Sequence, residues 1–248
     1  MPAHHMIVTM AGLGMRFRQA GYTVPKYQIV VRERTLFSWA MESLRNWFGG
    51  DVRFHFIARA EDRAGRFIEQ SCRDLGIADH LLVELDAPTD GQATTAMRAF
   101  PGIENPALPI SIYNIDTFVE PLFLPRDVPA CDGWIPCFPG KGDGWSFVRT
   151  NDRGEAVEVR EKVRVSPHAT IGFYWFSSAT LYESIYTEYY SIPEHLERGE
   201  RYVAPLYNHL ISQGRIVRIH EIPFSRVHAL GTPEEVDAFR NEPAASQQ

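Results

Sequence analysis

The stretch Met6-Ile-Val-Thr-Met-Ala-Gly-Leu-Gly-Met-Arg16 decides the fold, and a Pro-Lys pair ending at Lys26 follows it. Its apolar beginning predicts a buried strand, and its two glycines predict a loop directly behind that strand. Gly12 and Gly14 have no Cβ to keep a phosphate away from the backbone N–H groups, which form a concavity for anions. Arg16 and Lys26 add permanent positive charge. The stretch therefore predicts a strand that leads into a nucleotide-phosphate site.

Strand and helix patterns alternate through the first half of the chain. Strands are expected at 6–10, 52–58, 81–85 and 109–115, and helices at 35–48, 61–75 and 91–99. This order predicts a parallel sheet with helices on both faces.

The second half is richer in strands. They are expected at 133–138, 146–150, 156–159, 170–176 and 215–223, with helices at 178–190 and 203–213. The predicted fold is therefore α/β: a Rossmann-like three-layer sandwich with a mixed, mostly parallel central sheet. We expect a single domain over 1–240 and a flexible tail over 241–248.

The composition narrows the class of protein. With 248 residues, 44% hydrophobic and 23% charged, the chain is typical of a soluble globular protein. The net charge of −6 argues against a nucleic-acid-binding surface. We find no apolar run of the roughly 18 residues that a membrane span needs, and no signal-peptide pattern. Three cysteines, an odd number, indicate reduced thiols and a cytoplasmic location. The sequence leaves open whether copies of the chain form a homo-oligomer.

A second motif is the turn Asp86-Ala-Pro-Thr-Asp-Gly-Gln92, which opens a predicted helix. Gly91 allows a ligand to approach the backbone, and the Gln92 amide can both donate to and accept from the edge of a base. The alternative is an ordinary helix start capped by Thr89 or Asp90.

A third motif ends at Asp116, which directly follows the predicted buried strand at 109–115. Open α/β sheets bind ligands at the carboxyl ends of their strands. A triphosphate brings Mg²⁺, which proteins hold with one or two carboxylates in addition to phosphate oxygens. We therefore predict that Asp116 is a magnesium ligand; the alternative is that it caps the next turn.

The fourth motif is Glu158-Val-Arg-Glu-Lys162. Alternation along a strand places Glu158, Arg160 and Lys162 on one face, so a solvated edge strand is the plain alternative. The nearby tyrosines are expected to pack in the helical region rather than bind a ligand: Tyr182, Tyr186, Tyr189, Tyr190, Tyr202 and Tyr207.

The string Gly-x-Gly-x-Arg…Pro-Lys resembles the N-terminal motif of the nucleotidylyltransferases, the pyrophosphorylases that join a nucleoside triphosphate to a sugar phosphate or a similar phosphorylated metabolite. The resemblance extends from Met6 to about Phe239 and implies the nucleotide-diphospho-sugar transferase fold. It divides the chain into a nucleotide-binding half, about 1–120, and an acceptor-binding half, about 121–240.

The resemblance also implies roles for individual residues. The nucleotide would contact Ala11, Gly12, Leu13, Gly14, Gly91 and Gln92, and its triphosphate would be held by Arg16 and Lys26. The acceptor would contact Glu161, Lys162 and Gly172, with Lys162 binding its phosphate and Gly172 letting it lie against the backbone.

The chain departs from the family pattern at one metal position. The family often has a second metal-binding Asp two residues before a Gly-Thr pair, where this chain has Ala229. Either the neighbouring His228 takes over part of that role, or Asp116 and the phosphates hold Mg²⁺ without a second carboxylate.

The expected reaction is attack by the acceptor phosphate on the α-phosphorus of a nucleoside triphosphate, with release of pyrophosphate. The Ala-Gly-Leu-Gly form resembles family members that use UTP or CTP, and the overall pattern resembles enzymes that supply capsule or other surface polysaccharides. Two alternatives stay open. Ala229 would suit a non-catalytic nucleotide- or sugar-sensing protein of this fold, and a related glycosyltransferase would need an Asp-x-Asp motif, of which Asn114-Ile-Asp116 has half.

Overall fold

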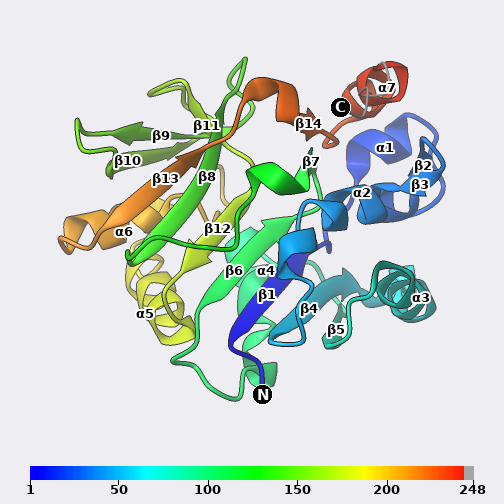
Figure 1. Ribbon diagram of the computed structural model, residues 1–248, viewed down its shortest axis with the longest axis horizontal. Helices are drawn as coiled ribbons and strands as arrows, with labels where there is room; N and C mark the ends of the chain where they lie inside the picture. The colour runs from blue at the N-terminus through cyan, green and yellow to red at the C-terminus, as the bar shows by residue number, and fades with distance from the viewer. Residues whose placement is uncertain (243–248) are drawn as a thin grey trace.

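A ten-stranded mixed sheet forms the centre of the protein, as seen in a computed structural model that describes residues 1–242 (Figure 1). Residues 243–248, the end of the predicted flexible tail, lie outside this range. The strands follow the order β10-β9-β11-β8-β12-β6-β1-β4-β5, and β13 adds to the side of β8. The predicted α/β fold with a mixed sheet is confirmed.

The first half of the chain supplies four parallel strands, with β1 between β4 and β6. They are β1 (His4–Thr9), β4 (Val52–Arg59), β5 (His80–Leu85) and β6 (Ile110–Asn114). In register, Thr9 lies opposite Ile57 on one side and Asn114 on the other. The carboxyl ends of β1 and β6 therefore meet at one edge of the sheet.

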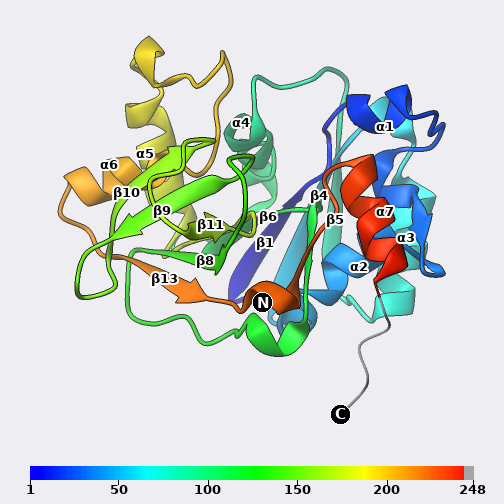
Figure 2. The same ribbon diagram turned by 90° about the horizontal axis from the view of Figure 1, so that it is seen from above.

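Helices cover both faces of the sheet (Figure 2). One face carries α2 (Leu36–Glu42) and α3 (Gly65–Leu75), and the other carries α4 (Gln92–Met97), α5 (Ala179–Tyr189) and α6 (Leu206–Ser212). Alternation along β1 explains the two cores, because Met6 and Val8 pack with α2 and α3 whereas Ile7 packs with α4. The expected helix at 35–48 is shorter, since it changes at Arg45–Trp47 into a 3₁₀ turn.

The remaining strands pair mostly in antiparallel fashion. They are β8 (Gly133–Pro139), β9 (Ser146–Thr150), β10 (Ala156–Glu161), β11 (His168–Thr170), β12 (Phe173–Phe176) and β13 (Val217–Glu221). The expected single strand at 170–176 is interrupted, because Gly172 adopts a left-handed φ of 78°. The chain thereby changes partners, from β8 and β9 on one side of Gly172 to β6 and β8 on the other.

A third cluster of apolar side chains lies beside the glycine loop, between α1 (Met15–Gln19), α2 and α7 (Pro233–Asn241). The short strands β7 (Thr117–Val119) and β14 (Val227–Ala229) pair beneath it, and β2 (Val30–Val31) pairs with β3 (Arg34–Thr35). Thr232 caps α7 and forms a full capping box with Glu235. The helices within residues 1–242 are all too short or too polar to traverse a lipid bilayer.

Candidate active site

The glycine loop and Asp116 lie next to each other because they leave neighbouring parallel strands. Residues 11–14 follow β1, and Asp116 follows β6. Lys26, at the start of a 3₁₀ turn, forms an ion pair with Asp116 Oδ1. A Cβ placed on Gly14 would lie 3.7 Å from the Lys26 Cβ, so the loop passes directly over this lysine. The structure thus brings three of the predicted site elements together.

The loop itself is open to solvent. Gly12 is exposed, and a Cβ added there would have no neighbour within 4 Å. Gly14 has a φ of 61° and precedes α1 in the left-handed conformation that glycine favours. Arg16 is exposed on α1, with no ion-pair partner recorded within residues 1–242. Loop and arginine are therefore accessible to an anionic ligand.

Asp116 has the features expected of a carboxylate that shares Mg²⁺ with a triphosphate. Its side chain is 47% exposed, and Oδ2 lies over Gly231, 3.7 Å from where a Cβ would stand. Within residues 1–242, no group of three or more His, Cys, Asp or Glu side chains is arranged to enclose a metal. One accessible carboxylate fits Mg²⁺ that arrives with its nucleotide, since phosphate oxygens and water complete such a site.

His228 has partners on the side of α7. Its Nδ1 lies 2.8 Å from Glu242 Oε2, and its ring stacks on Phe118 with centroids 5.3 Å apart. Ala229 lies opposite Thr117 in the β14–β7 pair. These contacts give no support to the prediction that His228 replaces the missing carboxylate, so we carry only Asp116 forward as a metal ligand.

Glu235 is a site neighbour that the sequence did not single out. Its Oε2 accepts hydrogen bonds from the N–H groups of Gly231 at 2.8 Å and Thr232 at 2.9 Å. Burial raises its pKa, the negative charge of Asp116 raises it further, and Lys26 opposes the shift. The capping residue of α7 thus belongs to the same charge cluster as the Lys26–Asp116 pair.

Gln92 and Gly91 occupy the first turn of α4, against the end of β1. Gln92 Nε2 donates to Thr9 Oγ1 at 3.2 Å. Gly91 has a φ of 140°, and a Cβ there would lie 2.4 Å from the Arg201 carbonyl oxygen. The close approach to the Gly91 backbone that we predicted for a ligand is thus made by the backbone of Arg201. A nucleotide role for Gly91 stays a prediction.

Gly172 lies at the same edge of the sheet, one strand away from Asp116. Asn114 N–H donates to the Gly172 carbonyl at 3.1 Å, and a Cβ on Gly172 would lie 2.3 Å from the Asn114 Oδ1. The Oδ1 of Asn114 is buried with no hydrogen-bond partner recorded in the described residues. The Asn114 carboxamide therefore fills the space that glycine leaves at the junction of the two halves.

Lys162 leaves the end of β10 in a left-handed conformation, with a φ of 52°. Its ammonium donates to the Tyr202 hydroxyl at 3.2 Å and lies 3.4 Å from Glu161 Oε1. Burial lowers the pKa of Lys162, but the hydrogen bond to Tyr202 and the charge of Glu161 outweigh it, so the pKa is raised. Glu161 is largely buried and accepts a hydrogen bond from Ser146. Lys162 is therefore a firmly charged group held between two partners.

Tyr202 was expected to pack with the other tyrosines, but it lies at Lys162. Arg201 beside it bonds to Asp90, so Lys162 is linked through Tyr202 to the loop that precedes α4. No helical or strand periodicity could have revealed the contact between Tyr202 and Lys162, because Tyr202 lies in the loop before α6.

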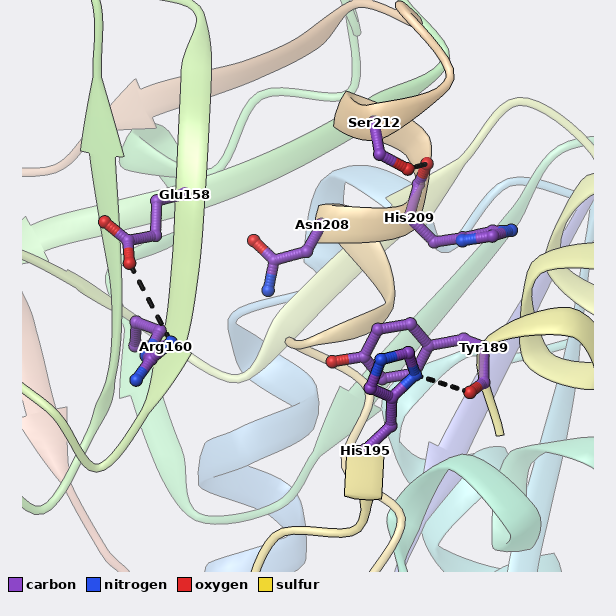
Figure 3. A pocket seen from close by; sticks show the side chains of 7 residues that line it. All are labelled: Glu158, Arg160, Tyr189, His195, Asn208, His209 and Ser212. Atoms are coloured by element: carbon purple, nitrogen blue, oxygen red, sulfur yellow. Dashed lines mark hydrogen bonds and ion pairs between the residues drawn. The ribbon is translucent and has the colours of Figure 1, made fainter. Parts of the chain in front are cut away.

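A separate pocket of about 410 Å³ opens between β10, the end of α5 and α6 (Figure 3). Several of its side chains are already engaged within the protein: the His195 ring stacks on Tyr189 with centroids 4.0 Å apart, and the Asn208 side chain bonds both the N–H and the carbonyl of Val159. Glu158 and Arg160 of the fourth motif line it, but none of the residues predicted to bind the nucleotide, the acceptor or the metal does. We therefore place the active site at the sheet edge.

Comparison with solved structures reveals the relatives of this chain. A nucleoside-diphosphate-sugar pyrophosphorylase from Vibrio cholerae is 33% identical, covers 96% of this chain and all of its own, and superposes with a TM-score of 0.86. The inositol-1-phosphate CTP transferase of T. maritima shares the fold, with 17% identity, 97% coverage of both chains and a TM-score of 0.71. So does a protein of Bacillus anthracis assigned as a glucose-1-phosphate thymidylyltransferase, with 16% identity, coverage of 99% of this chain and 98% of its own, and a TM-score of 0.74. No protein-family profile and no curated protein sequence matches the chain.

The fold and the full-length match to the Vibrio cholerae structure define a nucleotidyltransferase. The chain belongs to the family of the nucleoside-diphosphate-sugar pyrophosphorylases, since it matches the whole length of the Vibrio cholerae member at 33% identity.

Proposed function

We propose that the protein transfers the nucleotidyl group of CTP or UTP to a sugar phosphate or a similar phosphorylated metabolite, with release of pyrophosphate. The observation that carries this proposal is the placement of Lys26 on Asp116 directly under the glycine loop. A loop open to anions, a cation and an accessible carboxylate at one sheet edge suit a magnesium-bound triphosphate. The full-length match, at 33% identity, to a nucleoside-diphosphate-sugar pyrophosphorylase supports a sugar phosphate as the acceptor.

In the proposed reaction a phosphate oxygen of the acceptor attacks the α-phosphorus of the triphosphate. A new P–O bond forms, the bond between the α-phosphorus and the bridging oxygen breaks, and that oxygen leaves with the electron pair as part of pyrophosphate. The attacking group is already an anion near neutral pH, so the protein needs no general base. Catalysis depends on alignment and on neutralising charge.

The proposed roles follow from where each charge lies. Lys26 and Arg16 neutralise the triphosphate, Gln92 contacts the base, and Lys162 holds the acceptor phosphate. Asp116, together with phosphate oxygens, would hold Mg²⁺, and the ion would supply further positive charge to the leaving pyrophosphate. Lys26 pairs with Asp116, so its ammonium lies next to the carboxylate and offsets the negative charge that would repel an incoming nucleotide.

Pyrophosphate release tests the proposal. The protein is incubated with Mg²⁺, each of the four nucleoside triphosphates and a panel of sugar and polyol phosphates. We expect release with CTP or UTP and at least one acceptor, and none without acceptor. Failure of every pair, with the protein folded, would overturn the proposed substrates.

Separate binding measurements test the division of labour. Lys162→Ala should weaken acceptor binding far more than triphosphate binding, because it removes one point charge opposite one phosphate. Gln92→Ala should do the reverse and reduce discrimination among bases. The two-half interpretation fails if Lys162→Ala impairs binding of the triphosphate and leaves that of the acceptor unchanged.

We further propose that the product supplies capsule or other surface-polysaccharide synthesis, from the resemblance of the motif pattern to enzymes with that role. Such a reaction takes place where nucleoside triphosphates are made, in the cytoplasm.

A further inference from the structure

Two interactions hold the Lys162 ammonium against Tyr202. The ammonium donates to the tyrosine hydroxyl at 3.2 Å, and it also lies over the ring, 4.9 Å from the centroid. The side chain of Lys162 remains 30% exposed, so it is accessible from solvent while it is held. An ammonium has three N–H groups; one of them is committed to Tyr202, and Glu161 Oε1 lies 3.4 Å from the same nitrogen.

Tyr202 is itself fixed to the loop that begins α4. The neighbouring Arg201 donates its N–H to the Asp90 carbonyl at 2.8 Å, and its carbonyl accepts from Ala93 N–H at 2.9 Å. The Arg201 guanidinium lies 3.2 Å from Asp90 Oδ2. Gly91 packs so closely on this backbone that no other residue could be accommodated there unchanged.

The segment is also fixed from the side of α5. The Tyr190 hydroxyl donates to the Tyr202 carbonyl, and Val203, the next residue, is fully buried. The tyrosine is therefore attached to rigid structure on both sides, whereas the lysine has a long flexible side chain. Of the two, the tyrosine determines where the ammonium lies.

We propose that Tyr202 is a further residue of the acceptor site, a positioning residue that holds the Lys162 ammonium in place for the phosphate of the acceptor. The proposal rests on the function proposed above, in which Lys162 binds that phosphate. A lysine loses much side-chain entropy when it is fixed by a ligand, and fixing it beforehand removes that cost from binding. Tyr202 thus contributes to acceptor affinity without taking part in the chemistry.

Because the chain has few lysines, the effect of Tyr202 on phosphate binding can be measured at Lys162 alone. The chain has three lysines, Lys26, Lys141 and Lys162. Incorporation of ¹³C-labelled lysine gives each ε-CH₂ group an NMR signal and leaves the ammonium unmodified, and Lys162→Arg identifies the signal from Lys162. Titration with inorganic phosphate, and separately with glucose 1-phosphate, then gives the affinity reported by Lys162 without any turnover.

Tyr202→Phe removes the hydroxyl and keeps the ring. Because a hydrogen bond to a charged group is lost, we expect the dissociation constant at Lys162 to rise about 5-fold or more. Tyr202→Leu, which also removes the ring, should weaken binding further. Tyr189→Phe, on the far pocket of Figure 3, is the matched control and should leave the affinity unchanged. The unfolding midpoint of each variant shows whether it is folded.

The outcomes separate this inference from the proposed function. If Lys162 reports the same phosphate affinity in Tyr202→Phe and Tyr202→Leu as in the wild type, Tyr202 is a packing residue and the inference is overturned, whatever the enzyme turns over. If the wild-type Lys162 signal does not respond to either phosphate, both the acceptor role of Lys162 and the inference fail. A rise in the acceptor KM of Tyr202→Phe, with the triphosphate KM unchanged, is the kinetic counterpart of the expected result.

Discussion

The substitution Gly91→Ala tests how firmly the loop before α4 is attached to the segment that contains Arg201 and Tyr202. Gly91 has φ 140° and ψ 175°, a conformation that essentially only glycine adopts, and forcing another residue into it costs about 1 to 3 kcal/mol. The new Cβ would lie 2.4 Å from the oxygen and 2.5 Å from the nitrogen of Arg201. The two backbone hydrogen bonds on either side of Arg201 would therefore break, at about 1 kcal/mol each. We expect a loss of about 3 to 5 kcal/mol in the free energy of unfolding.

Urea denaturation of Gly91→Ala and of a control, Gly154→Ala, measures this loss. Gly154 also has a left-handed φ, 74°, but a Cβ there meets no atom within 4 Å. The control should therefore show only conformational strain, about 1 to 2 kcal/mol. Equal losses in the two variants would refute the interlock between Gly91 and Arg201.

Three further changes probe the charges of the protein. Lys26→Ala should lower turnover by about 100-fold or more, because a charge-assisted contact to the triphosphate is lost. The control is Lys141→Ala, which should retain wild-type turnover because the ammonium of Lys141 lies over Phe224. Equal rates in the two variants would contradict the proposed site. Asp116→Asn should abolish Mg²⁺-dependent activity at near-native stability, and activity that survives it or withstands EDTA would make Asp116 a turn residue. Burial lowers the pKa of His4 and of His55 to about 3, so both histidines are neutral in the folded protein near neutral pH. In the unfolded chain each has a pKa of 6.5, so below that pH the unfolded chain binds more protons than the folded protein. Stability is thus complete above pH 6.5 and falls with the pH toward 3, by about 2 kcal/mol per histidine at pH 5; urea midpoints that are equal at pH 7 and pH 5 would contradict this.

Local signals made most of the fold predictable. Alternation and apolar runs located β1, β4 and β6. The break at Gly172 escaped prediction, since an apolar run shows no periodicity at which a strand could be divided. The β7–β14 pair was missed because its strands are three residues each and lie more than one hundred positions apart.

The site was predictable where its residues follow parallel strands. Strand ends converge by topology alone, which is why the glycine loop and Asp116 meet. Tyr202 and Glu235 were missed because their positions depend on loop paths and on a helix cap. His228 was predicted as a metal ligand because it is next to Ala229 in the sequence. The pairing of β14 with β7 stacks its ring on Phe118.

The fate of the α-phosphorus tests the central claim most directly. The protein is given Mg²⁺, the acceptor phosphate that supports release of pyrophosphate, and CTP or UTP labelled with ³²P at the α position. Direct transfer predicts that the label appears in one new nucleotide-linked product, in amounts equal to the pyrophosphate released, and that Lys26→Ala slows both together. Label recovered as free nucleoside mono- or diphosphate, or a product that forms without pyrophosphate, would contradict nucleotidyl transfer to the acceptor.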